Sequence, residues 1–248
     1  MNKPAVVGLC SFLLVLAAAG VASAQTADAV VERYLSAVGG REALGKLASR
    51  KSTGRVTLST PGGDISGPIE ILLKSPNKNR AFMTLDLSAM GAGALTVEQR
   101  FDGTVGYSLN SLQGNSEITG NQLANMRNNT FPIPLLAYKE AGITVAMQSN
   151  ERIGGKDTTV VLVTPRAGSA MRMFFDTETH LLVRTIATIE TPQTGPIEQT
   201  SDFSDYRTVD GVKVAFRVVN TNPLQTLTIA LTSVEHNVAI DDAVFGKP

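Results

Sequence analysis

Two histidines and one serine–lysine pair are the residues of this chain that could support nucleophilic or acid–base chemistry. His180 and His236 lie far apart, and each falls in or beside a segment with strand-like alternation. A catalytic histidine needs an orienting partner, and the sequence signals none. Ser75 and Lys78 have the S-x-x-K spacing, but the Pro-Asn between them favours a turn, whereas that chemistry needs a helix to bring the two side chains together. We expect none of these residues to be catalytic.

Acidic residues could instead hold a metal ion or cleave a glycosidic bond. Two acids such as Glu98 and Asp202 could act as a pair if the fold joined them. Residues 176–179 contain too few acids for the EF-hand spacing, and their short polar side chains favour a turn. The sequence has no H-E-x-x-H, G-x-S-x-G or P-loop motif. We therefore predict that the protein is not an enzyme and has no cofactor or metal site, and an unrecognised hydrolase is the alternative.

The composition argues against nucleic-acid binding. The 248 residues include 22 basic and 22 acidic side chains, so the net charge is zero and no basic footprint is present. With no Trp and only 4 Tyr, the chain also has few side chains on which bases could stack. Its apolar content of 43% is too high for a disordered polymer. We expect a folded monomer that does not bind nucleic acid.

Residues 1–24 have the pattern of a secretory signal peptide. Lys3 is followed by an apolar run that contains no charge. Ala22 and Ala24 then form the A-x-A pattern of a cleavage site. We therefore predict that the protein is exported, that cleavage follows Ala24, and that the mature chain is residues 25–248.

Two alternatives for the N-terminus stay open. One is an anchor that is not cleaved, and the other is lipidation of Cys10. The bulky Leu9 before Cys10, and the apolar residues that follow it, argue against a lipoprotein cleavage site. Because Cys10 is the only cysteine, the mature chain would have no disulfide and would depend on its core alone.

Short helical segments open the mature chain and interrupt its middle. In residues 28–38 the apolar side chains form one stripe along a helix, and two glycines then end it. A second helix is expected over residues 41–48. The insert in the middle of the chain predicts a helix over residues 119–129 and a further short helix over residues 135–141.

Most of the remaining chain alternates apolar and polar residues with a period of two, between turn signals such as Asp-Gly. One apolar and one polar face per strand is typical of an antiparallel sheet that is wet on one side. The spacing predicts about ten strands in one domain, residues 25–248. We expect a mainly β (α+β) fold, an unclosed antiparallel β-barrel with helices covering its concave face.

The concave face of such a sheet is too large for so few helices to cover. We therefore expect an apolar cavity between the sheet and the helices that suits a lipid-like ligand. The residues predicted to line this cavity are large apolar side chains of the helices and the strands: Tyr34, Leu35, Leu44, Met83, Leu85, Leu95, Val97, Met126, Leu135, Phe175 and Phe216.

Several short motifs follow one another along the mature chain. They lie at residues 34–44, 74–78, 101–103, 175–184, 204–212 and 238–245. In this order behind a signal peptide they resemble the LolA-like family of bacterial periplasmic proteins, the outer-membrane lipoprotein carriers and lipoprotein-sorting proteins. The chain departs from the family pattern at His180, where a Gly is usual, and at Ala215, where a Pro is common. The arginine that guards the acyl site in the family matches no particular residue here.

The resemblance implies an unclosed barrel with helices on its concave side, a cavity for acyl chains and a location in the periplasm. We therefore predict a periplasmic binding or carrier protein for lipid or lipoprotein acyl chains, with a lipid or an acylated protein as its partner. The alternative is an envelope interaction or sensor module of the same fold that does not transport and that docks a protein partner. A lined cavity favours the first function, and an exposed apolar patch or edge strand favours the second.

Overall fold

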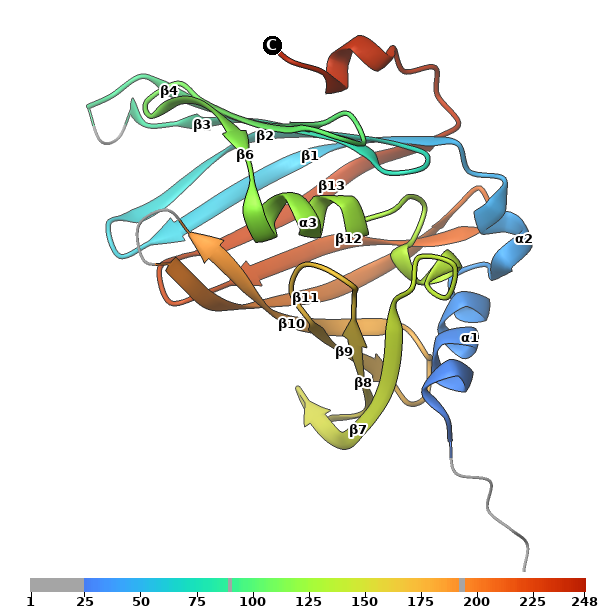
Figure 1. The fold of residues 1–248 in the computed structure, drawn as a ribbon. Helices are drawn as coiled ribbons and strands as arrows, with labels where there is room; N and C mark the ends of the chain where they lie inside the picture. Colours follow the sequence, from blue (N-terminus) through green and yellow to red (C-terminus); the bar gives the residue numbers. More distant parts are fainter. Residues whose placement is uncertain (1–24, 89–90, 192–194) are drawn as a thin grey trace, which may run out of the picture.

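A single antiparallel sheet of thirteen strands dominates the computed structural model, which describes residues 25–88, 91–191 and 195–248 (Figure 1). The predicted signal peptide lies outside the described residues. The strand order is β6-β5-β4-β3-β2-β1-β13-β12-β11-β10-β9-β8-β7. The strands are β1 (Ser49–Thr60), β2 (Gly63–Lys74), β3 (Lys78–Asp86), β4 (Ala94–Phe101), β5 (Gly106–Asn110), β6 (Gly114–Ile118), β7 (Thr144–Ile153), β8 (Lys156–Thr164), β9 (Met171–Asp176), β10 (Leu182–Thr191), β11 (Gly195–Val209), β12 (Val212–Thr221) and β13 (Thr226–His236).

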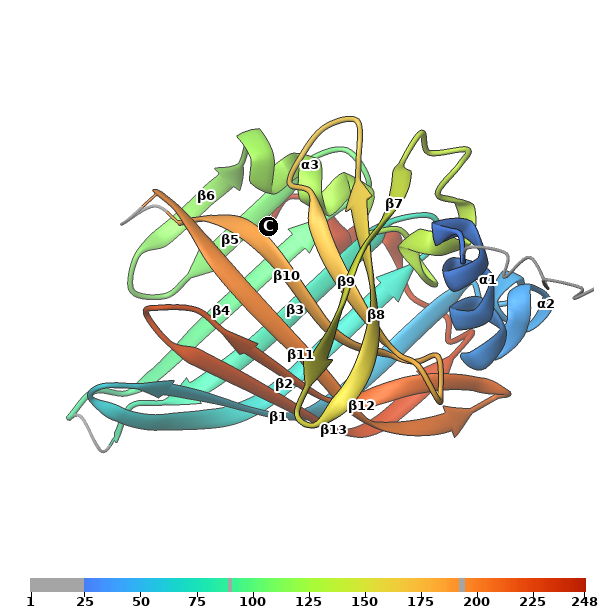
Figure 2. The ribbon, with the colours of Figure 1, turned by 90° about the horizontal axis from the view of Figure 1, so that it is seen from below.

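The sheet curves strongly but does not close, because β6 and β7 are its two edges and do not pair with each other (Figure 2). The unclosed antiparallel barrel predicted from the sequence is therefore confirmed. The alternation pattern predicted about ten strands, and the described chain has thirteen. The edge strands β6 and β7 are mostly polar and exposed on both faces, so they carry little of the alternation by which the other strands are recognised.

Among the described residues, three α-helices and two 3₁₀-helices accompany the sheet. They are α1 (Ala27–Ala37), α2 (Gly40–Gly45), α3 (Gly120–Asn128), η2 (Pro134–Ala137) and η3 (Asp242–Phe245). Helix α1 begins after Thr26, whose hydroxyl oxygen accepts a hydrogen bond from the Ala29 amide at 3.2 Å. Helices α2 and η2 are shorter than expected and end at Gly45 and Ala137. None of the helices in the described ranges is long and apolar enough to span a membrane.

One end of the concave face is filled by α1, α2 and η2 (Figures 1 and 2). Val31, Leu35 and Leu44 are at most 1% exposed and pack into a cluster with side chains of the sheet such as Val161 and Phe175. Burial of this stripe, at about 25 cal/mol per Å² of apolar surface, holds the helices against the strands.

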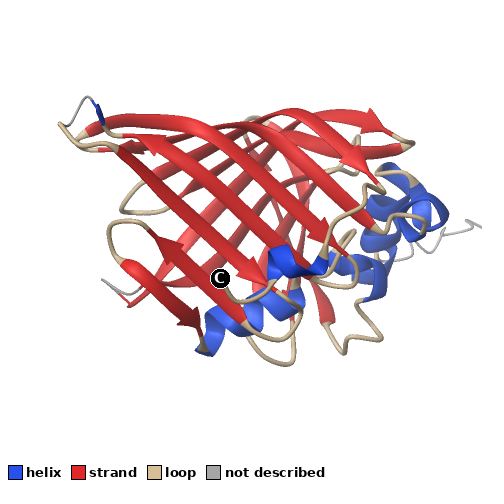
Figure 3. Cartoon of the chain, turned by 90° about the horizontal axis from the view of Figure 1, so that it is seen from above, coloured by secondary structure: helices blue, strands red, loops and turns tan. Residues whose placement is uncertain are grey.

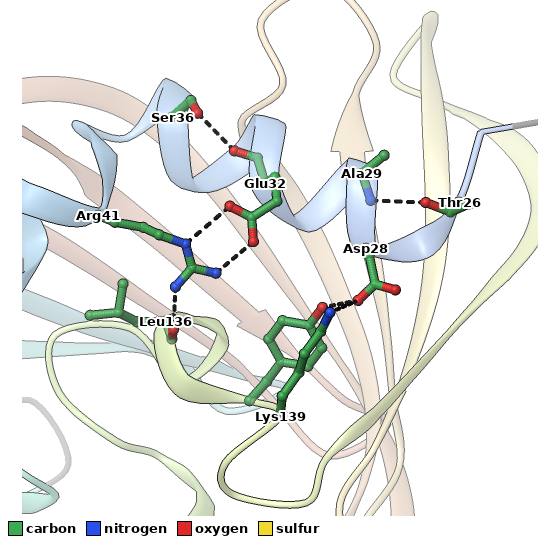
Figure 4. Close-up of polar contacts among 9 residues, drawn as sticks. Thr26, Asp28, Ala29, Glu32, Ser36, Arg41, Leu136 and Lys139 are labelled. Atoms are coloured by element: carbon green, nitrogen blue, oxygen red, sulfur yellow. Dashed lines mark hydrogen bonds and ion pairs between the residues drawn. The ribbon is translucent and has the colours of Figure 1, made fainter. Parts of the chain in front are cut away.

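Polar contacts join α1 to the segment around η2 (Figure 4). The Arg41 guanidinium binds the Glu32 carboxylate and also donates to the Leu136 carbonyl oxygen at 2.7 Å. At the start of the helix, the Asp28 carboxylate accepts from the Tyr138 hydroxyl and pairs with Lys139 at 3.0 Å. Helix α1 and η2 therefore form one connected plug.

Helix α3 links the two sides of the unclosed sheet. The Met126 sulfur lies against Gly106 of β5, so closely that a Cβ added to Gly106 would be 3.1 Å from it. On the other side, Asn125 Oδ1 accepts from the Ser169 amide at 2.8 Å. The Asn128 side chain donates to the Ala167 carbonyl, also at 2.8 Å, in the loop between β8 and β9.

The convex face carries charged side chains and the C-terminal segment. Figure 3 shows this segment lying across the outside of the sheet. Phe245 of η3 is fully buried there, and Asp242 pairs with Lys74 at 2.8 Å and with Lys78 at 2.7 Å. These two lysines hold the pKa of the Asp242 carboxyl well below its usual range, at about 2. The C-terminal segment thus covers the outer face over β3 and β4 and is held there by ion pairs.

Candidate ligand-binding cavity

The concave face contains a cavity of about 340 Å³ that the helices do not line. Its walls come from β2, β3 and β4 on one side and from β11, β12, β13 and the β12–β13 turn on the other. The lining residues are Ile69, Ile71, Ala81, Met83, Val97, Gln99, Gln199, Asn220, Asn222, Gln225, Leu227 and Ile229. The sequence pattern predicts a cavity between the sheet and the helices. It lies instead within the bend of the sheet, because α1, α2 and η2 fill only one end.

Strand register explains why these side chains share one face. Ile69 of β2 is paired with Met83 of β3, and Met83 is paired in turn with Val97 of β4. Residues directly opposite each other in neighbouring strands point to the same side of a sheet. Leu227 and Asn220 are paired in the same way on β13 and β12. The bend of the sheet then brings these two groups of strands to one cavity.

The floor of the cavity is apolar and incompletely covered. Ile69 is buried, but Ile71, Met83, Leu227 and Ile229 are only half-buried. Aliphatic side chains on the inner face of a sheet would normally be covered by another layer of the protein. Here they face an open volume, so an apolar ligand that entered it would remove their surface from water.

Carboxamide side chains supply all the polar groups that line the cavity. They belong to Gln99, Gln199, Asn220, Asn222 and Gln225, and no lining residue is charged. Asn220 is oriented by the Ser201 hydroxyl, which donates to its Oδ1 at 2.6 Å. Asn222 Oδ1 accepts from the amides of Leu224 and Gln225 at 2.9 and 3.1 Å. The other three carboxamides form no hydrogen bond with the part of the chain that the structure describes.

A cluster of three polar side chains, Arg50, Ser52 and His236, lies on the inner face near the helical plug. Arg50 of β1 is paired with His236 of β13, and Arg50 Nε, Ser52 Oγ and His236 Nε2 are buried without a hydrogen-bond partner among the described residues. The guanidinium lies 5.9 Å from the centre of the Phe131 ring. Buried polar atoms are normally satisfied, so this group departs from the rule.

Burial sets the protonation of these residues. It lowers the pKa of Arg50 to about 10 and raises the pKa of the nearby Tyr34 hydroxyl to about 12. The His236 side chain is only 2% exposed, and its Nδ1 lies 3.2 Å from Asp210 Oδ2. Burial, helped by the charge of Arg50, lowers the pKa of His236 in spite of Asp210. Arg50 is therefore a cation and His236 is neutral near pH 7.

The cluster of Arg50, Ser52 and His236 borders the cavity but does not line it. Ser52 is paired with Ile71, which does line the cavity, and Arg50 is paired with Leu73, which packs into the helix–sheet cluster. Arg50 thus lies one step beyond the cavity, toward the helices.

The side chains predicted to line a single site are distributed over several parts of the fold. Met83 and Val97 line the cavity. Five others belong to the cluster between helices and sheet: Tyr34, Leu35, Leu44, Leu135 and Phe175. Leu85 and Leu95 belong to a second apolar cluster beside the cavity. Phe216 belongs to a third cluster, and the Arg207 guanidinium lies over its ring. Met126 lies on α3. As a ligand-binding set these residues remain a prediction.

Sequence reasoning missed the carboxamides and the group around Arg50. A signal was present, because Gln99 occupies a position in the apolar phase of its strand, two residues after Val97 and two before Phe101. A polar residue at such a position either breaks the core or lines a polar cavity. Arg50 likewise shares the inward phase of β1 with Val56.

The residues that could have supported catalysis have structural partners. Glu98 binds Arg80 and Arg100, and Asp202 binds Arg184. Lys78 is held by Asp242. Asp176 Oδ1 accepts from the amides of Glu178 and Thr179, as in the turn predicted there. No three His, Cys, Asp or Glu side chains within the described ranges are close enough to hold a metal ion.

No family model and no curated protein matches the sequence. Solved structures do match its fold. A domain from Vibrio parahaemolyticus, described as an outer-membrane lipoprotein-sorting protein, covers 87% of this chain and 94% of its own, with a TM-score of 0.55 and 10% identity. A LolA superfamily protein from Nitrosomonas europaea covers 90% and 99%, with a TM-score of 0.56 and 12% identity. The chain has the LolA-like fold.

A third match widens the range of sequences that adopt this architecture. It is a DUF1329 family protein from Desulfovibrio piger, which covers 89% of this chain and 97% of its own, with a TM-score of 0.56 and 13% identity. At such identities the likeness concerns the fold. The resemblance in fold inferred from the turn motifs is thereby confirmed, and function must be argued from the cavity.

Proposed function

We propose that the protein is an exported periplasmic carrier that binds the acyl chain of a lipid or an acylated protein in the cavity of its half-barrel. The observation that carries the proposal is the uncovered apolar floor, where Ile71, Met83, Leu227 and Ile229 border a volume of about 340 Å³. Apolar burial at about 25 cal/mol per Å² would drive capture without any covalent step.

The size of the cavity suggests how much of a ligand it holds. Ligand pockets commonly span about 300–1,000 Å³, and this cavity, at about 340 Å³, lies at the small end. It suits one acyl chain rather than the several chains of a lipoprotein anchor.

The chemistry of the lining supports binding rather than turnover. Its side chains are aliphatic, thioether or carboxamide groups, and none of these is a nucleophile or a general acid–base group at neutral pH. A ligand held there would leave unchanged.

A filled cavity tests the proposal. Ala81 is the smallest side chain of the lining, and Ala81→Phe should project a ring into the volume. We expect the affinity for the neutral fluorescent probe N-phenyl-1-naphthylamine to fall by about tenfold or more, a loss of about 1.4 kcal/mol, because the ring would occupy volume that the probe needs. Equilibrium fluorescence titration of the mature protein measures it.

The matched control is Ala230→Phe. Ala230 follows Ile229 on β13, so its side chain points to the opposite face. The control should bind the probe as the wild type does. If the wild type shows no saturable uptake, or if both variants bind equally, the proposed use of this cavity is wrong.

A second candidate function, docking of an envelope protein, is supported by the edge strand β7. It pairs only with β8 in the described chain and exposes Met147, which is 36% exposed. An unpaired edge can accept a strand from another protein. Docking at β7 would survive Ala81→Phe, whereas lipid uptake would not, so the same variant separates the two functions.

A further inference from the structure

We propose that the cavity selects single-chain amphiphiles whose head group is uncharged and carries hydroxyl groups. This inference rests on the proposed function and adds the class of ligand. It arises from the lining of the cavity, where an aliphatic floor meets five carboxamides and no charged side chain.

The carboxamides are placed on both walls of the cavity and at one end. Gln99 belongs to β4 and Gln199 to β11, on opposite sides of the bend. Asn222 and Gln225 form the turn between β12 and β13. Since β12 begins beside α1, where the Lys213 amide donates to the Val38 carbonyl at 2.8 Å, this turn lies at the end of the strand away from the helical plug.

This placement gives a ligand a direction. The apolar floor of Ile69, Met83 and Ile229 would hold the chain. The turn at Asn222 and Gln225 would meet the head group at the end that the helices leave open. A chain bound in this direction would place its polar end among the carboxamides.

Much of the hydrogen-bonding capacity of the carboxamides is not used by contacts within the described chain. Gln99, Gln199 and Gln225 have no side-chain partner among the described residues, and Asn220 and Asn222 use their oxygen atoms in the bonds already given. The amino groups of both asparagines are left to donate. A carboxamide offers donors and an acceptor without net charge, which matches a hydroxyl group, itself a donor and an acceptor.

A charged head group would find no counter-ion in the cavity. Transfer of an ionised group from water is costly unless it is paired, and the lining offers neither a cation nor an anion. The buried cation Arg50 lies beyond Ser52 and does not line the volume. The lining therefore discriminates against both fatty acids and cationic amphiphiles.

Three probes with the same lauroyl-length chain test the inference. They are monolauroylglycerol, laurate and dodecyltrimethylammonium, each used to displace N-phenyl-1-naphthylamine from the mature protein. We expect monolauroylglycerol to bind most tightly. In Gln99→Met and Gln199→Met its affinity should fall by about two- to tenfold per carboxamide lost, whereas the affinity for laurate should not fall. The matched control is Gln113→Met, at an exposed turn between β5 and β6.

The outcomes distinguish this inference from the proposed function. If the fluorescent probe binds but the three amphiphiles displace it equally, the head-group selectivity is wrong. If laurate binds most tightly and Arg50→Met removes that preference, the polar anchor is Arg50 and the inference is overturned while the carrier function stands. If the wild type binds no probe at all, the carrier function itself fails.

Discussion

At the scale of single residues, the unusual feature is a set of polar side chains in the apolar phase of the strands. Arg50, His236 and Gln99 all occupy inward positions. Alternation alone could predict which residues face inward, and it did so for Met83 and Val97. It could not show which inward polar residues border open volume, because that depends on how the sheet bends and on where the helices end.

The buried ring of His236 should make stability depend on pH. Burial lowers the pKa of the folded His236, so the unfolded chain, in which histidine has a pKa of about 6.5, binds the proton more tightly. The stability linked to the neutral ring is present above about pH 6.5 and is lost as the pH falls below that value. Urea unfolding at pH 7.5 and pH 5.5 should show a smaller loss for His236→Gln than for the wild type.

His180→Asn is the matched control for this comparison. His180 lies in the β9–β10 turn with a φ of 57°, a conformation that asparagine tolerates. The control should keep the pH dependence of the wild type. Equal losses for His236→Gln and the wild type would show that the ring does not titrate as its burial requires.

At the scale of elements, hydrophobic burial rather than ion pairing fixes the helical plug. The sequence predicts helix α1 over residues 28–38, and the helix spans Ala27–Ala37. The two ranges agree closely because the apolar stripe runs along the whole helix. Helices α2 and η2 have only six and four residues and are shorter than predicted, since such short elements contain too few residues for a periodic pattern to mark their ends. The edge strands β6 and β7 carry little of the alternation that marks a strand, because exposed strands need no apolar face.

Two substitutions in the plug should differ clearly in their cost. Leu35 is 1% exposed, so Leu35→Ala should lower the free energy of unfolding by about 2–5 kcal/mol. Arg41 and Glu32 are about half exposed, at 48% and 50% of their side chains, so Arg41→Met should cost less than about 1 kcal/mol. Chemical denaturation of the two variants measures both values. A larger cost for Arg41→Met than for Leu35→Ala would contradict this order.

At the scale of the whole molecule, one curved sheet is covered unequally. The plug of α1, α2 and η2 fills one end, and α3 links the two sides of the sheet (Figures 1 and 2). The lining of the cavity forms an uncovered apolar floor between them. The sequence predicted that the concave area would exceed the helical cover. It could not predict that the remaining cavity would be lined by strands alone, because that depends on the bend that brings β4 and β11 to the same volume.

Native mass spectrometry of the protein purified from the periplasm tests the carrier function most directly. We expect the wild type to carry a bound species with the mass of a single-chain amphiphile, and Ala81→Phe to be purified without it while keeping the wild-type fold by circular dichroism. A wild type free of any bound lipid, which also fails to take up monolauroylglycerol when it is added, would contradict the account.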